Sequence, residues 1–121
     1  MPLIQSKEGL RLLGRIRQLC TRYPEFYEHI DDFGHTSFRV RDKPFLIMSE
    51  WSGSFLLNMK LLYETQDFLV QTGRFEKSAY IGQHGWTLLR LDNTADWEEV
   101  EDLIDDAYRR VAPKSVRKIL D

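Results

Sequence analysis

The sequence predicts an α+β fold, a two-layer sandwich in which an antiparallel sheet carries helices packed on one face. Three observations predict it. Apolar residues recur at helical spacing near both ends of the chain, they alternate with polar residues in its middle, and short turn sequences separate the alternating segments. The resulting order is a helix, three strands, a helix, two strands and a helix. Strands joined by short turns pair antiparallel, which leaves the helices to cover one sheet face.

A first helix is predicted from Ser6 to Arg22, with Ser6 as its N-cap and Pro24 closing it. Its apolar stripe comprises Leu12, Leu13, Ile16, Leu19, Cys20 and Tyr23. The basic residues Lys7, Arg11, Arg15 and Arg22 lie on its other side, where we expect a solvated surface. The connection 25–33 is expected to be irregular.

Strands follow where the period changes to two. They are predicted at residues 35–41, 45–51 and 54–60, joined by turns at Asp42-Lys43-Pro44 and Ser52-Gly53. A helix over 61–72, ended by Gly73, comes next, and then two strands at 77–81 and 86–91 around the turn Gly82–Gly85.

The last long helix is the most strongly patterned element. Asp96 is its N-cap, Glu99 completes a capping box, and Pro113 ends it before the basic segment 114–118. Trp97 opens the apolar stripe, so we expect its side chain to be buried against the sheet.

Composition limits the class of protein. With 121 residues we expect one domain over 1–121, and no apolar run reaches the roughly 20 residues that a membrane span needs. The lone Cys20 suits a reducing compartment, so a cytoplasmic location without membrane association is expected, with Cys20 as a buried structural residue. The net charge of −2 argues against a strongly basic nucleic-acid binder and requires any such function to use a local patch.

Several short motifs, in order, carry a family resemblance. They are Phe33-Gly34-His35 followed by Phe38-Arg39-Val40, Tyr80 with Gly82, Gly85 and Trp86, Arg90-Leu91-Asp92, Asp96-Trp97 with Val100, Ala107-Tyr108-Arg109 and Val111-Ala112-Pro113-Lys114. From about Leu10 to Lys114 the chain resembles the MmcQ/YjbR family. The resemblance implies a small CyaY-like α+β fold. It also implies a DNA-binding label, which rests on likeness to a double-wing phage transcription-factor domain.

Basic residues concentrate in the strands and turns, whereas acidic residues dominate the last helix. We expect the basic side chains to share the sheet face that the helices leave open, where they would contact the phosphates of DNA, with RNA as the other candidate partner. The candidate nucleic-acid-binding residues are Arg39, Arg41, Lys43, Lys60, His84, Trp86 and Arg90. An ordinary solvated sheet face is the competing interpretation, as are a tight turn at 82–85 and simple packing of Trp86.

The alternative function is binding of a protein or small ligand in a pocket near His35, Arg39, His84 and Trp86. No nucleophile, phosphate-loop or zinc-protease motif occurs, and the histidines lack metal-ligand spacing. We therefore expect no enzyme activity, no cofactor and no metal. The acidic face of the last helix is similar to the carboxylate ridge of frataxin-type proteins, but exposed carboxylates on one helix favour a solvated face. This face comprises Glu98, Asp102, Asp105 and Asp106.

Overall fold

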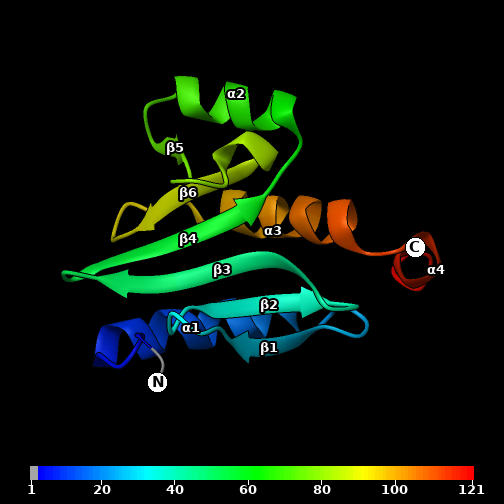
Figure 1. The fold of residues 1–121 in the computed structure, drawn as a ribbon, viewed down its shortest axis with the longest axis horizontal. Coiled ribbons are helices and arrows are strands. Elements are labelled where there is room, and N and C mark those ends of the chain that lie inside the picture. The colour runs from blue at the N-terminus through cyan, green and yellow to red at the C-terminus, as the bar shows by residue number, and fades with distance from the viewer. Residues whose placement is uncertain (1–2) are drawn as a thin grey trace.

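A computed structural model describes residues 3–121, so the first two residues of the domain predicted over 1–121 lie outside the described part. Figure 1 shows the order of the elements along the chain. They are α1 (Lys7–Cys20), β1 (Tyr27–Ile30), β2 (Thr36–Val40), β3 (Lys43–Trp51), β4 (Ser54–Lys60), α2 (Tyr63–Gln71), β5 (Phe75–Lys77), the 3₁₀ turn η1 (Gly82–His84), β6 (Trp86–Leu91), α3 (Trp97–Val111) and α4 (Lys114–Arg117).

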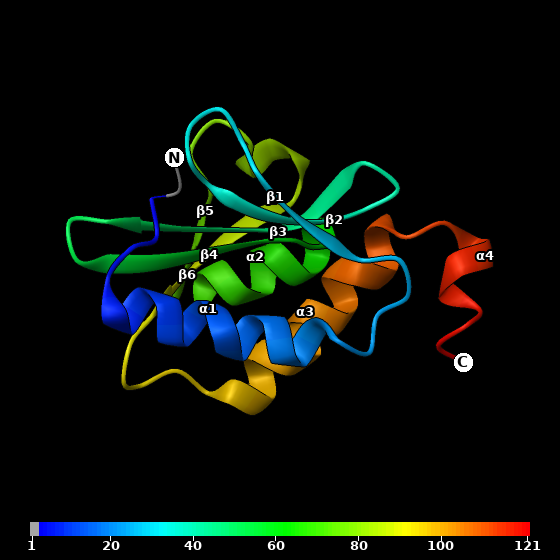
Figure 2. The ribbon, with the colours of Figure 1, turned by 90° about the horizontal axis from the view of Figure 1, so that it is seen from below.

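The described strands form one six-stranded antiparallel sheet in the order β1-β2-β3-β4-β6-β5. Helices α1 and α3 cover one face of this sheet (Figure 2), and α2 packs beside β5 and β6 at the sheet's end. The predicted α+β sandwich is confirmed.

Strand register separates the two faces of the sheet. Phe38, Leu46 and Met59 are paired across β2, β3 and β4 and are fully buried beneath the helices. The next positions along these strands face away from the helices, because side chains alternate between faces. They carry Ser37, Ile47, Asn58 and Leu88, which are paired in one row across β2, β3, β4 and β6. We call this second surface the open face.

Capping side chains explain where helices α1 and α3 begin. Ser6 Oγ accepts a bond from the Gly9 N–H at 3.0 Å and donates to Glu50 Oε1 at 2.7 Å, which ties the start of α1 to β3. Asp96 accepts from the N–H groups of Glu98 and Glu99, as predicted. The second half of the predicted capping box is wrong, because the Glu99 carboxylate binds the Arg74 guanidinium at 2.8 and 3.0 Å.

Four local predictions are corrected. Residues 27–30 form the edge strand β1, and Lys114–Arg117 form a short helix. The strand predicted at 77–81 lies earlier, at Phe75–Lys77, because Tyr80 has a φ of 67° that no regular strand accommodates. Trp97 packs on the core but is only partly buried.

Candidate functional site

One end of the sheet gathers several basic side chains around a tryptophan. Strand β4 ends there at Lys60, which pairs in register with Trp86, the first residue of β6. Strand β3 begins at the same place with Lys43, and the last turn of α3 brings Arg110 there. With Pro44 and Val111, these residues line a cavity of ≈ 400 Å³, which we call the Trp86 cleft.

Trp86 forms a firm wall of this cleft. Its side chain is only 5% exposed, and Lys60 Nζ lies 6.0 Å from the centre of its ring. The buried Gln66 amide of α2 donates to the carbonyl oxygens of Gly82 and Trp86, each at 2.9 Å. These bonds fix the 3₁₀ turn to the start of β6 and hold Trp86 in place.

The 82–85 turn requires glycine at position 85. Its φ is 93°, in the left-handed region, and its carbonyl accepts a bond from the Leu61 N–H at 3.0 Å. A Cβ at this position would lie 2.2 Å from the Leu61 carbonyl oxygen. Only glycine therefore allows the 82–85 turn to approach the end of β4 so closely.

Charge pairing separates the predicted cations into two groups. Among the residues from 3 to 121, Lys43, Lys60 and Arg110 form no ion pair. Arg39 is also without a carboxylate partner in this part of the chain, and its Nε donates to Ser37 Oγ at 3.0 Å. At this end of the sheet these four side chains are available to an anionic ligand, and we call them the basic end.

Arg41 and Arg90 differ from that group. The Arg41 guanidinium binds both carboxylate oxygens of Glu25, at 2.7 and 3.0 Å, and this bond lowers the pKa of Glu25. Arg90 lies 3.7 Å from Glu76. It is also four residues along β6 from Trp86, so it lies away from the basic end.

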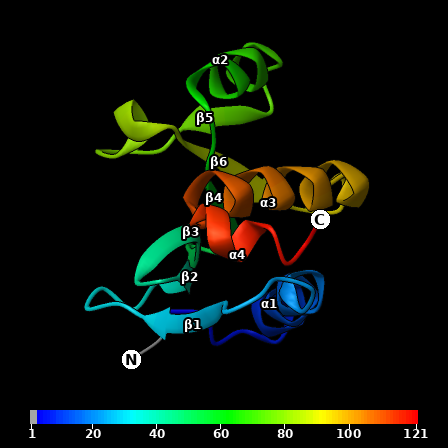
Figure 3. The same ribbon diagram turned by 90° about the vertical axis from the view of Figure 1, so that its right-hand side faces the viewer.

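The predicted basic open face is therefore corrected in its distribution. Arg39, Lys60 and Arg90 have open-face positions, but the middle of that face is neutral and partly apolar, with Ile47 and Leu88 at its centre. The 3₁₀ turn lies on this side of the sheet, opposite α1 and α3 (Figure 3), and Ser78 before it donates to Asn58 Oδ1 at 2.6 Å. The cations lie at strand ends and not across the whole surface.

The pocket predicted from His35, Arg39, His84 and Trp86 is not formed. His35 precedes the first residue of β2, whereas Arg39 is near its last, and His35 Nδ1 lies 3.4 Å from Asp31 Oδ2. His84 is exposed on η1 and is not among the residues that line the Trp86 cleft. Arg110 is the residue that sequence reasoning missed, because its approach to Trp86 is a long-range contact without a local signal.

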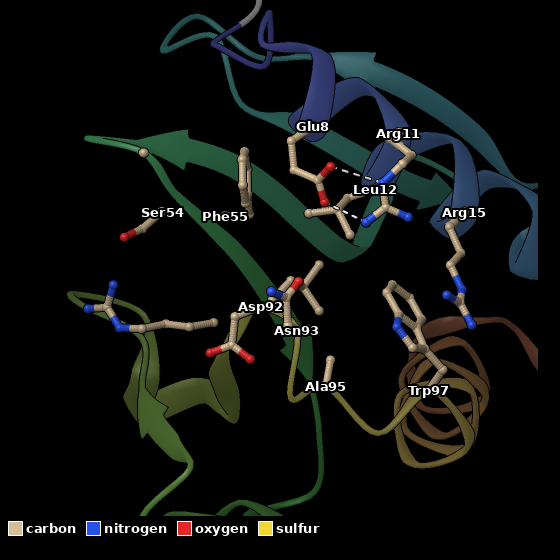
Figure 4. Close-up of a pocket in the computed structure, with 13 residues that line it drawn as sticks. Glu8, Arg11, Leu12, Arg15, Ser54, Phe55, Asp92, Asn93, Ala95 and Trp97 are labelled. Carbon is tan, nitrogen blue, oxygen red and sulfur yellow. Dashed lines mark hydrogen bonds and ion pairs between the residues drawn. The ribbon is translucent and has the colours of Figure 1, made fainter.

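A larger groove lies at the opposite end of β6 (Figure 4), with a volume of ≈ 610 Å³. It runs between α1, the β3–β4 hairpin and the segment that leads into α3. Phe55, Leu12 and Trp97 contribute its apolar surface, and Arg15 lies over the Trp97 ring with its Cζ 4.0 Å from the ring centre. Arg15 is therefore not the purely solvated residue predicted.

Other candidate chemistry is limited. Cys20 is fully buried, as predicted, and burial raises the pKa of its thiol to about 12. Asp105 of the acidic face accepts bonds from the Tyr23 hydroxyl and from Arg109 Nε. Across residues 3–121, no group of three or more histidine, cysteine, aspartate or glutamate side chains is arranged to hold a metal ion. No helix within that range is both long enough and apolar enough to cross a membrane.

Comparisons with known proteins agree with this fold. The chain is similar to the crystal structure of protein DR2400 from Deinococcus radiodurans, a DUF419 domain, with a TM-score of 0.77 and 20% identity over 89% of this chain and 86% of the other. Comparison with curated proteins finds no match. The YjbR family model matches residues 21–110, which is most of the chain and includes the whole sheet, the Trp86 cleft except for Val111, and nearly all of α3. The chain therefore belongs to the YjbR family.

Proposed function

We propose that this domain is a non-enzymatic nucleic-acid-binding module whose basic end contacts the phosphate backbone. The observation that carries the proposal is the set of four cations without carboxylate partners at one end of the sheet. They are Arg39, Lys43, Lys60 and Arg110. Such cations bind phosphates without first breaking an ion pair, and they release condensed counterions from the nucleic acid.

The same geometry argues for backbone contacts over base contacts. Trp86 is too buried to stack on a nucleobase from its present position, so its part is to support Lys60 and the wall of the cleft. Phosphate contacts position a protein on nucleic acid but read no sequence. We therefore expect weak sequence preference and a strong dependence on salt.

Fluorescence anisotropy with labelled DNA and RNA of mixed sequence tests the proposal. Lys43→Gln, Lys60→Gln and Arg110→Gln should each weaken binding to all sequences alike. Arg90→Gln is the matched control, because Arg90 has an open-face position but lies near Glu76, away from the basic end. Absence of binding at low salt, or equal losses in the control, would overturn the proposal.

The groove in Figure 4 favours a second candidate, binding of a small ligand. Its volume of ≈ 610 Å³ is within the range of ligand sites, and Phe55 and Trp97 offer aromatic surface beside the Arg11 and Arg15 guanidinium groups. A fragment screen followed by amide chemical shifts distinguishes the two candidates. Shifts confined to this groove, with no response of the basic end to nucleic acid, would favour small-ligand binding over nucleic-acid binding as the function.

A further inference from the structure

A second cavity adjoins the basic end on the far side of Arg110. It has a volume of ≈ 300 Å³ and lies between the start of α2, the last turn of α3 and α4, whose positions Figure 3 shows. Arg110 and Arg117 both line it. The remaining lining residues are Leu62, Thr65, Asp106 and Arg109.

Each of these two arginines has one buried donor without an acceptor. The Nε atoms of Arg110 and Arg117 are buried, and neither has a hydrogen-bond partner. The neighbouring Arg109 shows the contrast, because its Nε donates to Asp105 at 2.8 Å and its Nη1 to Asp121 at 2.9 Å. A buried donor without an acceptor is unfavourable, and both of these Nε donors belong to side chains that line the same cavity.

The charges around the cavity favour an anion. Asp106 is its one lining carboxylate, and it forms no ion pair with either arginine among the described residues. Arg109 is already neutralised by Asp105 and Asp121. Arg110 lies over the Tyr63 ring, 5.7 Å from its centre, and neither Arg110 nor Arg117 forms an ion pair among the described residues. Two guanidinium groups against one carboxylate leave a net positive site.

We infer that Arg110 and Arg117 form a binding site for a phosphoryl group. Guanidinium groups match the tetrahedral oxygens of phosphate with paired N–H donors, and two of them suit a doubly charged anion. A phosphoryl group in the cavity would supply acceptors to the guanidinium N–H groups of the arginines that line it. The inference rests on this cavity and does not require that the basic end bind nucleic acid.

Isothermal titration calorimetry with inorganic pyrophosphate measures the affinity of this site and tests the inference. The wild-type protein should bind pyrophosphate, and Arg117→Gln should weaken this binding at least tenfold. The affinity of Arg117→Lys should lie between these two, because lysine retains the positive charge but lacks the paired N–H donors of the guanidinium group. Lys118→Gln, at the residue directly after the same short helix, is the matched control and should retain affinity. Asp106→Asn should strengthen binding, since it removes the opposing carboxylate. Circular dichroism checks each fold, and Arg117→Lys provides the test if Arg117→Gln does not fold.

Lys60→Gln separates this site from the Trp86 cleft, because Lys60 lines only the cleft. It should leave pyrophosphate affinity unchanged. Loss of binding in Lys60→Gln but not in Arg117→Gln would place the anion in the cleft and overturn the inference, as would no binding by the wild type. If pyrophosphate fails while salt-dependent nucleic-acid binding through Lys60 remains, this inference falls and the proposed function stands.

Two sources of a phosphoryl group share this chemistry, a nucleic-acid end and a small phosphate ester. Oligonucleotides with and without a terminal 5′-phosphate distinguish them. A preference for the phosphorylated strand that Arg117→Gln removes assigns the site to nucleic-acid ends. Equal binding of both strands, with pyrophosphate binding intact, assigns it to small phosphate esters.

Discussion

A few single residues hold the Trp86 cleft in its shape. Gly85 allows the 82–85 turn to approach Leu61, and the Gln66 amide then holds the start of β6 through two backbone carbonyls. Lys60 and Trp86 meet because of this arrangement, and Arg110 closes the space from α3. The chemistry of the site depends on how these few residues pack.

Gly85→Ala should destabilise the protein more than Gly73→Ala. Both glycines have positive φ, 93° and 85°, so each substitution incurs the left-handed penalty of roughly 1–2 kcal/mol. A Cβ at Gly73 meets open space, whereas one at Gly85 meets the Leu61 carbonyl oxygen, which adds roughly 1–3 kcal/mol. Urea unfolding of both variants measures the difference. Equal losses would show that the 82–85 turn relaxes away from Leu61.

Asp106 should give an acid-dependent contribution to stability. Partial desolvation of this largely exposed carboxyl group, with further contributions from Asp105 and Asp102, raises the pKa of Asp106 above its ordinary value of 3.8. The folded state then binds the proton more tightly than the unfolded chain, so this stabilisation is present at low pH and lost as pH rises through the folded-state pKa. Asp106→Asn should therefore raise Tm at pH 7, and the gain should disappear below about pH 3.8. A Tm lowered at pH 7 would contradict the assignment.

At the scale of elements, side chains of α1 and α3 contact each other near the protein surface as well as in the core. Trp97 packs partly on the core, and Arg15 of α1 covers its ring. The aromatic side chain is therefore shared between two helices and the sheet. This contact also forms one wall of the groove in Figure 4.

A double-mutant cycle should detect that contact. Complete burial of a tryptophan would make its loss cost roughly 3–5 kcal/mol, so at this partly buried site we expect about 2 kcal/mol for Trp97→Ala. Arg15→Ala and Trp97→Ala should couple by about 0.5–1 kcal/mol, measured by chemical denaturation. Arg11→Ala is the control and should not couple, because Arg11 pairs with Glu8 on its own helix. Zero coupling for Arg15 would mean that the stacking does not persist in solution.

The elements also show which patterns can be predicted from sequence. Helix α3 has a long apolar stripe and the Asp96 cap, so its place was predictable almost to the residue. Strands β1 and β5 have only 4 and 3 residues and lie at the two edges of the sheet. Too few alternating positions remain in such edges to distinguish them from loops. The family resemblance, by contrast, rests on several motifs and is confirmed.

At the scale of the whole molecule, charge is distributed unevenly on a chain with a net charge of −2. Acidic side chains line the exposed side of α3, while unpaired cations gather where β4 ends and β6 begins. The positions of Lys43, Lys60 and Trp86 at strand ends were predictable because they follow strand and turn signals. Arg110 was not, because its role depends on where the last turn of α3 lies relative to the sheet.

The salt dependence of binding to duplex DNA tests the central claim most directly. If Arg39, Lys43, Lys60 and Arg110 each neutralise about one phosphate, the logarithm of the association constant should fall with the logarithm of salt concentration with a slope of about −3 to −4. Lys60→Gln should reduce the magnitude of this slope by about one, and Arg90→Gln should leave it unchanged. A slope near zero, or the same loss in both variants, would contradict a basic end that binds nucleic-acid phosphates.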